Sequence, residues 1–370
     1  MAKPPLRLAG LRRERIQSSP QFADGVFRNT SPVGAGLRKG TALSTAAEFF
    51  CGGQHRTPPA PLPSRSPLEA WSRPPETGLR ATWLGHSTVL LELDGRRVLT
   101  DPVWGERASP TSFAGPKRFQ PVPVAIARLP PLDAVVISHD HYDHLCRESV
   151  IALAATGVPF FTSLGVGARL AGWGVPEAQL TELDWWESAE VGPLTITAAP
   201  SQHFSGRGVG DRNRTLWSSF AVRGSRQAFF FSGDTGLTSE YRAIRERLGP
   251  FDLTLLEVGA FHPAWGDIHL GPENALEAHA LLGGAALLPV HWGTFNLAIH
   301  DWDAPAETLL KLAPGKGATL VMPRLGEPVE PSRVEAVVPW WREIAALERR
   351  GARRVPDEEP EELVLGEPID

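Results

Sequence analysis

Short runs in which apolar and polar residues alternate begin at residue 79 and continue to residue 100. Alternation of this kind is typical of β-strands with one buried face. The pattern predicts strands at 81–84, 88–93 and 98–100. Between the last two, Asp94 and Gly95 favour a tight hairpin turn.

Apolar runs rich in β-branched and aromatic residues recur after residue 130 and are separated by stretches of helical periodicity. We expect further strands at 132–137, 158–162, 194–198, 217–223, 227–232, 253–257, 286–290 and 318–322, and helices at 147–156, 165–172, 238–247, 272–282 and 304–312. So many strands with so few amphipathic helices pack naturally as two sheets with helices outside them. Side chains at the strand ends would then gather at one rim.

The first 75 residues lack this pattern. They are rich in Pro, Arg, Ser and Gly, with a weak helical stretch at 42–50. Residues 1–50 contain eight Lys or Arg and three acids, whereas residues 351–370 contain seven acids and two Arg, so we expect both ends to be solvated. The predicted organisation is an N-terminal extension at 1–75, one large domain at 76–345 and an acidic tail at 346–370.

The composition bears on compartment and partners. The chain has 370 residues, of which 42% are hydrophobic, and this is enough to bury a large core. A net charge of −5 gives no basic field, so we do not expect nucleic acid as a partner. Two cysteines are too few for a disulfide framework, and no apolar run is long enough to span a bilayer. We expect a cytoplasmic protein, with peripheral membrane contact through the basic N-terminal segment as the alternative.

One stretch concentrates the candidate chemistry. His139, His141, Asp143 and His144 follow directly on an apolar strand-like run. The pattern H-x-H-x-D-H is rare by chance, and imidazole and carboxylate groups both suit zinc-like ions. His139 and His141 can converge on one ion, while Asp143 and His144 can face a second. Iron or manganese would suit the same side chains.

Three later positions fit the same rim of strand ends. His203 and His291 each follow a strand-like run, and Asp234 lies on a glycine-flanked turn after the run of three phenylalanines at 229–231. Any one of them alone is as well explained by a structural histidine or an Asx turn. Together they extend the first cluster to seven metal-ligand candidates, and each follows a buried strand.

These residues lie in stretches that resemble a known family. The stretches are TWLGHST, LTDPVW, RASP, GPKRF, LPPLDAVVISHDHYDHL, LDWWE, PSQHF, FFFSGDTG, LGPFDL and HWGTF. The ligand order is similar to that of the metallo-β-lactamase superfamily, and the stretches are similar to N-acylphosphatidylethanolamine-hydrolysing phospholipase D within it. The resemblance covers roughly residues 79–325 and implies an α/β fold, the four-layer αββα sandwich. Before it, the shared motif is Phe27-Arg28-Asn29.

The resemblance also implies roles for individual residues. His139, His141 and His203 would hold one zinc ion, and Asp143, His144 and His291 would hold the other. Asp234 would bridge the two ions. His269 matches a family histidine near the substrate phosphate, although a surface histidine at the start of a helix remains the alternative. Asp143, Asp234 and His269 are therefore the expected catalytic residues.

The expected function is zinc-dependent hydrolysis of a phosphodiester. The resemblance points to cleavage of N-acylphosphatidylethanolamine or a related phospholipid to phosphatidic acid and an N-acylethanolamine, by a hydroxide that bridges the two metals. Four alternatives remain: a metallo-hydrolase of a lactone or cyclic nucleotide, an RNA-processing enzyme, a non-catalytic metal-binding protein and a redox iron protein. The family stretches outside the ligands favour the phospholipase, and the oligomeric state is left open.

Overall fold

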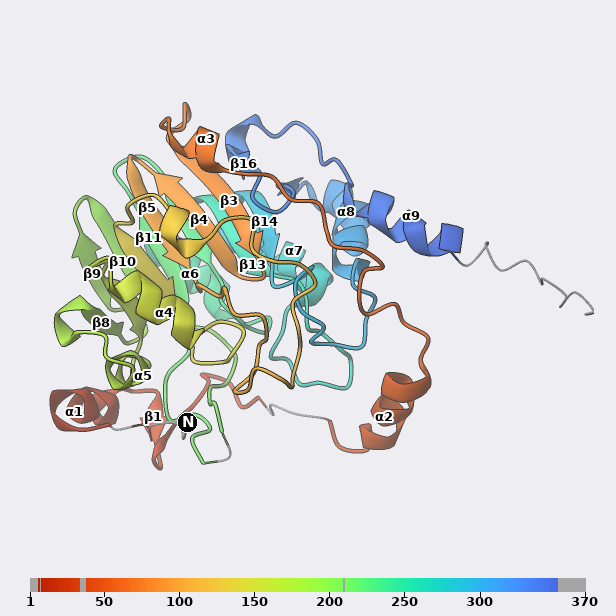
Figure 1. The fold of residues 1–370 in the computed structure, drawn as a ribbon. Helices are drawn as coiled ribbons and strands as arrows, with labels where there is room; N and C mark the ends of the chain where they lie inside the picture. The colour runs from red at the N-terminus through yellow and green to blue at the C-terminus, as the bar shows by residue number, and fades with distance from the viewer. Residues whose placement is uncertain (1–5, 7, 34–37, 209, 352–370) are drawn as a thin grey trace, which may run out of the picture.

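Two β-sheets packed face to face form the body of the protein, with helices on their outer sides (Figure 1). The computed structural model describes residue 6 and residues 8–33, 38–208 and 210–351. Each sheet has seven strands. The predicted fold class, an α/β protein with an αββα sandwich, is confirmed.

The first sheet is built from strands within residues 79–183, with the late strand β16 added at one edge. Its order is β16 (Pro328–Val329), β3 (Leu79–Gly85), β4 (Thr88–Leu93), β5 (Arg96–Thr100), β6 (Ala134–Ile137), β7 (Phe160–Ser163) and β8 (Leu180–Leu183). The strands from β16 to β5 pair antiparallel, and those from β5 to β8 pair parallel. Asp94 and Gly95, both at positive φ, form the predicted turn between β4 and β5.

The second sheet repeats this arrangement with later residues. Its order is β15 (Thr319–Leu320), β14 (Gly284–Val290), β13 (Phe251–Glu257), β12 (Ala228–Phe231), β11 (Ser219–Arg223), β10 (Leu194–Ala199) and β9 (Ser188–Val191). The strands from β9 to β12 pair antiparallel, and those from β12 to β15 pair parallel. The edge strands β8 and β9 were not predicted, because their polar, partly exposed residues form no apolar run.

The burial of successive residues explains the four layers. Along β6, Ala134 and Val136 belong to the core between the two sheets, whereas Val135 and Ile137 belong to a second core under α4. Successive side chains of a strand point to opposite faces, so a strand that is apolar at every position must be covered on both sides. The helices provide the outer cover.

The helices fall into those that cover the sheets and those that lie beyond them. They are α1 (Gly10–Ser18), α2 (Ala42–Cys51), α3 (Leu68–Trp71), α4 (Arg147–Ala154), α5 (Gly167–Gly172), α6 (Glu240–Leu248), α7 (Gly271–Leu282), α8 (Ala304–Lys316) and α9 (Trp341–Gly351). Residues of α4 and α5 pack on the first sheet, and residues of α6, α7 and α8 pack on the second. In Figure 1, α2 stands apart from the layers at the lower right.

The expectation that the N-terminal segment is fully solvated is wrong for its first part. Ile16 of α1 and Phe27 of β2 (Val26–Phe27), which pairs with β1 (Phe22–Ala23), are buried against Trp185 and Trp217. These apolar side chains are too far apart in sequence to form a recognisable run, so their burial was not visible in the pattern. The predicted domain boundaries stay a prediction, and the tail from residue 352 onward lies outside the described residues.

Candidate metal centre

The candidate ligands lie on loops that leave the strand ends of both sheets. His139 and His141 follow β6 of the first sheet, while His203 follows β10 and Asp234 follows β12 of the second. His291 follows β14. Strand ends give loops a stiff base, so side chains held there converge with little freedom. The structure therefore brings together the residues that the sequence indicated as metal-ligand candidates.

The first group contains His139, His141, His203 and Asp234, whose ligand atoms all lie within 4.8 Å of one another. His141 Nδ1 is 2.8 Å from His139 Nε2 and 3.3 Å from His203 Nε2. Asp234 Oδ2 is 3.7 Å from His203 Nε2 and 4.0 Å from His139 Nε2. Three nitrogens and one carboxylate oxygen are a donor set that suits a zinc-like ion.

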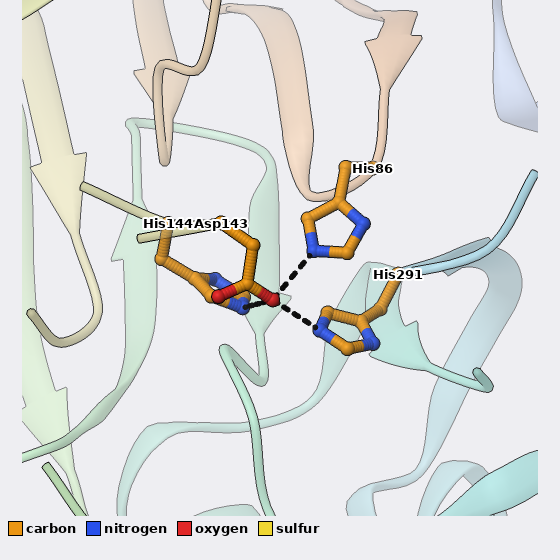
Figure 2. A group of neighbouring side chains, drawn as sticks. All are labelled: His86, Asp143, His144 and His291. Carbon is orange, nitrogen blue, oxygen red and sulfur yellow. Dashed lines mark hydrogen bonds and ion pairs between the residues drawn. The ribbon is translucent and has the colours of Figure 1, made fainter. Parts of the chain in front are cut away.

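The second group contains His86, Asp143, His144 and His291 (Figure 2). Asp143 Oδ2 lies 3.1 Å from His86 Nε2, 3.3 Å from His291 Nε2 and 3.5 Å from His144 Nε2. Three imidazoles thus surround one carboxylate oxygen, as the dashed lines in Figure 2 show. This is again a set of three nitrogens and one oxygen.

Asp234 contacts both groups. Its Oδ2 atom faces the first group, whereas its Oδ1 atom lies 3.1 Å from His144 Nε2 and 3.2 Å from His291 Nε2. His144 Nε2 and Asp234 Oδ1 are buried and form no hydrogen bond with the described residues. Buried polar atoms that form no hydrogen bond are costly, and a bound cation would satisfy both. The donor set therefore fits metal ions.

His86 was missed by the sequence reasoning. It lies in the turn between β3 and β4, is 1% exposed and has φ of 53°, and Thr294 Oγ1 accepts its backbone N–H at 2.6 Å. His86 could have been predicted by the same pattern that indicated His203 and His291, which is a histidine directly after an apolar strand. It also stands within the quoted stretch TWLGHST. Cys146 is buried and belongs to neither group.

A further layer of contacts orients the imidazoles. Asp101 Oδ2 lies 2.6 Å from His144 Nδ1, and Asp101 also accepts hydrogen bonds from the Ser138 N–H and hydroxyl. The carbonyl of Ile268 accepts from His203 Nδ1 at 2.9 Å. Such partners fix the tautomer and leave Nε2 free to face an ion. The sequence did not predict this role for Asp101, because the residue simply follows the end of β5.

Burial keeps several imidazoles neutral. It is the largest cause that lowers the pKa of His86, to about 3, and it lowers the pKa of His139 and His203 well below the ordinary value. Repulsion from neighbouring histidines lowers all three further. Neutral imidazole is the form that binds a metal, so these side chains need not lose a proton first.

The carboxylates carry their negative charge in the buried site. Burial alone would raise the pKa of Asp143 and Asp234, but His144 and its neighbours outweigh burial and hold both pKa values well below the ordinary value. Burial would lower the pKa of His144 and His291, but the negative charges of Asp234 and Asp143 outweigh it. They raise the pKa of His144 well above its ordinary value and that of His291 to about 10. A divalent cation would replace this positive charge and release the protons.

His269 lies beside this centre and is paired with Glu257, which sequence reasoning also missed. Its Nδ1 atom is 3.1 Å from Glu257 Oε1 and 4.0 Å from Asp234 Oδ2. Glu257 is fully buried at the end of β13 and also accepts the backbone N–H groups of Thr235 and Leu270. Burial would lower the pKa of His269, but the carboxylates of Glu257 and Asp234 outweigh it and raise the pKa. Glu257 could have been predicted from the sequence because it is a charged residue at the end of an apolar run.

His269 lines a cavity of about 350 Å³. Phe261, Trp265 and Leu270 give it apolar walls, and Arg38 lies at its margin. Arg38 Nη2 forms an ion pair of 2.9 Å with Asp267, which also lines the cavity. Ligand sites are commonly apolar hollows with a few polar groups, so this cavity is the candidate substrate site.

The fold and the two neighbouring metal-ligand groups define the class of metallo-hydrolases with an αββα sandwich. Residues 96–292 match the Beta-lactamase superfamily domain, and the chain belongs to that superfamily. An uncharacterized protein of Mycobacterium tuberculosis is 46% identical over 331 residues, which are 88% of each chain.

Two further proteins are similar to this chain. The N-acyl-phosphatidylethanolamine-hydrolyzing phospholipase D 1 of Caenorhabditis elegans is 42% identical over 248 residues, 64% of this chain and 70% of that one. Among solved structures, Igni18, a novel metallo hydrolase of Ignicoccus hospitalis, is 25% identical with a TM-score of 0.53. That match covers 68% of this chain and 97% of the other. The resemblance inferred from the sequence is confirmed.

Proposed function

We propose that the protein is a zinc-dependent phosphodiesterase of the phospholipase D type. Its substrate is N-acylphosphatidylethanolamine or a related phospholipid, and its products are phosphatidic acid and an N-acylethanolamine. The observation that carries this proposal is Asp234, whose two oxygens face two separate groups of three histidine nitrogens each. The similarity to the Caenorhabditis elegans enzyme supports the choice of substrate.

His139, His141, His203 and Asp234 would hold one ion, and His86, Asp143, His144 and His291 the other, with Asp234 shared between them. When bound, the two ions supply a hydroxide at neutral pH and stabilise negative charge on the phosphodiester oxygens. Water oxygen then becomes bonded to phosphorus, and the bond from phosphorus to the ethanolamine oxygen breaks.

In this proposal His269 acts on the leaving oxygen. Glu257 accepts a hydrogen bond from its Nδ1 atom, which leaves Nε2 as the nitrogen available to a substrate in the adjoining cavity. Protonated His269 can donate to a phosphate oxygen or protonate the departing alkoxide. The raised pKa of His269 favours that protonated form near neutral pH.

Peripheral contact with an anionic lipid surface is part of the proposal. Leu43 and Phe50 of α2 are 87% and 81% exposed, and with Ala46 and Ala47 they form a stripe at helical spacing. Arg38 precedes the helix and is exposed, as is its neighbour Lys39. An apolar stripe beside basic residues is the pattern of helices that lie in a membrane interface. Among the described residues, no helix is long and apolar enough to cross a bilayer.

The test is to incubate purified protein with N-acylphosphatidylethanolamine, other phospholipids, soluble phosphodiesters and lactones, in water enriched in ¹⁸O. We expect N-acylethanolamine to be released and the heavy oxygen to appear in phosphatidic acid, because the attack is on phosphorus. Heavy oxygen in the alcohol, or turnover of lactones alone, would contradict the proposal. Zinc, iron and manganese are measured in the same preparation by mass spectrometry, and two zinc ions per chain are expected.

A further inference from the structure

Asn29 of the N-terminal extension contacts the backbone of the metal-ligand candidate His203. Asn29 Nδ2 donates to the backbone carbonyl of His203 at 2.8 Å, and the backbone N–H of His203 donates to Asn29 Oδ1 at 3.0 Å. We propose that Asn29 is a positioning residue that fixes the backbone of His203 and so allows its imidazole to hold a metal ion. This inference rests on the role of His203 in the proposed function.

The backbone around His203 has lost its strand partners. β10 ends at Ala199, and in the loop that follows side chains accept several of the backbone N–H groups. Thr235 Oγ1 accepts the N–H of Gln202 at 3.0 Å, and Asp140 Oδ1 accepts the N–H of Gly206 at 2.7 Å. At His203 the carboxamide of Asn29 replaces a neighbouring strand, because it both donates to the backbone carbonyl and accepts from the backbone N–H.

Backbone and ring of His203 are thus fixed by different segments. The Ile268 carbonyl accepts from Nδ1 at 2.9 Å, which orients the ring, while Asn29 holds the main chain from which the ring projects. Displacement of the main chain would move Nε2 relative to His139, His141 and Asp234, which complete the group. Partners of this kind commonly change metal affinity by about 10- to 100-fold when they are removed.

The packing of the extension explains why Asn29 is available at this place. Phe27 is fully buried, and its backbone N–H donates to the Asn213 carbonyl at 2.7 Å. Two residues later, Asn29 Oδ1 also accepts from Trp217 Nε1 at 3.0 Å. Phe27 and Asn29 belong to the motif that stands apart in the extension, ahead of the superfamily match at residues 96–292. The buried Phe27 therefore anchors the segment, and Asn29 makes the contact with the ligand.

The experiment compares full-length wild type, Asn29→Ala, Arg28→Ala and His203→Ala, each loaded with zinc. Arg28 is the matched control because it is adjacent, exposed and paired with Asp24. Zinc per chain is measured after dialysis against a graded series of chelator concentrations. For Asn29→Ala we expect one ion to be lost at about 10- to 100-fold less chelator than in wild type. His203→Ala should lose the same ion, and Arg28→Ala should retain both as wild type does.

A second variant guards against a folding failure of Asn29→Ala. Asn29→Asp can still accept from His203 N–H and Trp217 Nε1–H but cannot donate to the His203 carbonyl, so it should lose less affinity than Asn29→Ala. Equal zinc retention in wild type, Asn29→Ala and Asn29→Asp would overturn the inference, as would unchanged retention in His203→Ala. Zinc retention is measured without substrate, so a protein that binds two ions but cleaves no phosphodiester refutes the proposed function alone.

Discussion

Asp234 shows how one side chain can organise the centre. Its Oδ2 atom faces His139 and His203, and its Oδ1 atom faces His144 and His291. Both oxygens need negative charge, because Oδ2 is the carboxylate ligand of the first group and Oδ1 adds a second carboxylate beside Asp143 in the second. An uncharged side chain of the same shape would keep the packing and lose the bridge.

We therefore expect Asp234→Asn to fold normally and to lose at least about 100-fold in turnover, since the amide supplies neither the charge nor the second oxygen. Metal content should fall below two ions per chain. Mass spectrometry of the metal content and circular dichroism of the same sample measure both effects. A variant that retained two tightly bound ions and turned over as wild type does would show that Asp234 is not the bridge.

His269→Ala should lower turnover by about 10²- to 10⁴-fold while both metal ions stay bound, because it removes a proton donor that belongs to neither of the two groups proposed to hold the ions. His269 also lies in a third possible ligand group with Asp234, Glu257 and His291. The loss should shrink for a nitrophenyl phosphodiester, whose leaving group needs little protonation. The measurement is kcat on both substrates with metal content in parallel. Equal turnover on every substrate would make His269 a structural residue, and loss of metal would make it a ligand.

Among the secondary-structure elements, those with long apolar runs were predictable from the sequence. β6, β12 and β14 are buried on both faces, and so the ligands that follow them could be located. The edge strands β8 and β9 are polar, and their pairing depends on neighbours brought close by the fold. The same limit applies to the residues that support the centre. Asp101 acts through contacts with residues far away in the sequence, and no local pattern shows such contacts. For Glu257 the local signal was its place at the end of an apolar run, but its pairing with His269 was not visible.

The packing of α7 on β13 predicts an effect of pH on stability. His279 of α7 lies 2.8 Å from the Thr254 hydroxyl of β13, and burial lowers its pKa from 6.5 to about 4. The folded state thus binds this proton less readily than the unfolded chain. The stabilisation is complete above pH 6.5 and is lost as the pH falls towards 4.

His279→Gln should keep a polar contact with Thr254 but cannot titrate. Between pH 7 and pH 4.5, wild type should lose about 2 kcal/mol more unfolding free energy than the variant. Urea unfolding with a chelator present measures this, since it removes the contribution of metal loss. Parallel pH profiles of the two proteins would show that His279 does not contribute to acid sensitivity.

The exposed stripe of α2 leads to a prediction about lipid binding. Leu43→Ser combined with Phe50→Ser should weaken binding to anionic phospholipid vesicles by about tenfold or more, because each apolar side chain contributes roughly 1.5–3 kcal/mol when buried. Hydrolysis of a soluble phosphodiester should be unchanged. Leu11→Ser is the matched control, since Leu11 is 79% exposed but lies on α1, away from α2 in Figure 1. Vesicle sedimentation that is equal for all three proteins would exclude α2 as the contact.

In the whole molecule, the metal centre connects the two sheets. The first group takes His139 and His141 from the first sheet, and His203 and Asp234 from the second. In the second group, His291 comes from the second sheet and the other three residues come from the first. Each bound ion would therefore join two layers that otherwise meet through apolar packing. The centre is then part of what holds the sandwich together as well as its reactive site.

This connection predicts that zinc stabilises the whole domain. An ion that binds only the folded state should raise the unfolding free energy by about 2.7 kcal/mol when free zinc is a hundred times its dissociation constant. Urea unfolding is followed in buffered zinc and in chelator, with Ile196→Val as the control. Ile196 is buried between the sheets, so this substitution should cost about 0.5–1.5 kcal/mol equally in both conditions. Asp234→Asn should lose much of the zinc-dependent increase, because its change affects both groups. If zinc stabilised wild type and Asp234→Asn equally, the ions would be bound elsewhere on the protein and would not join the sheets.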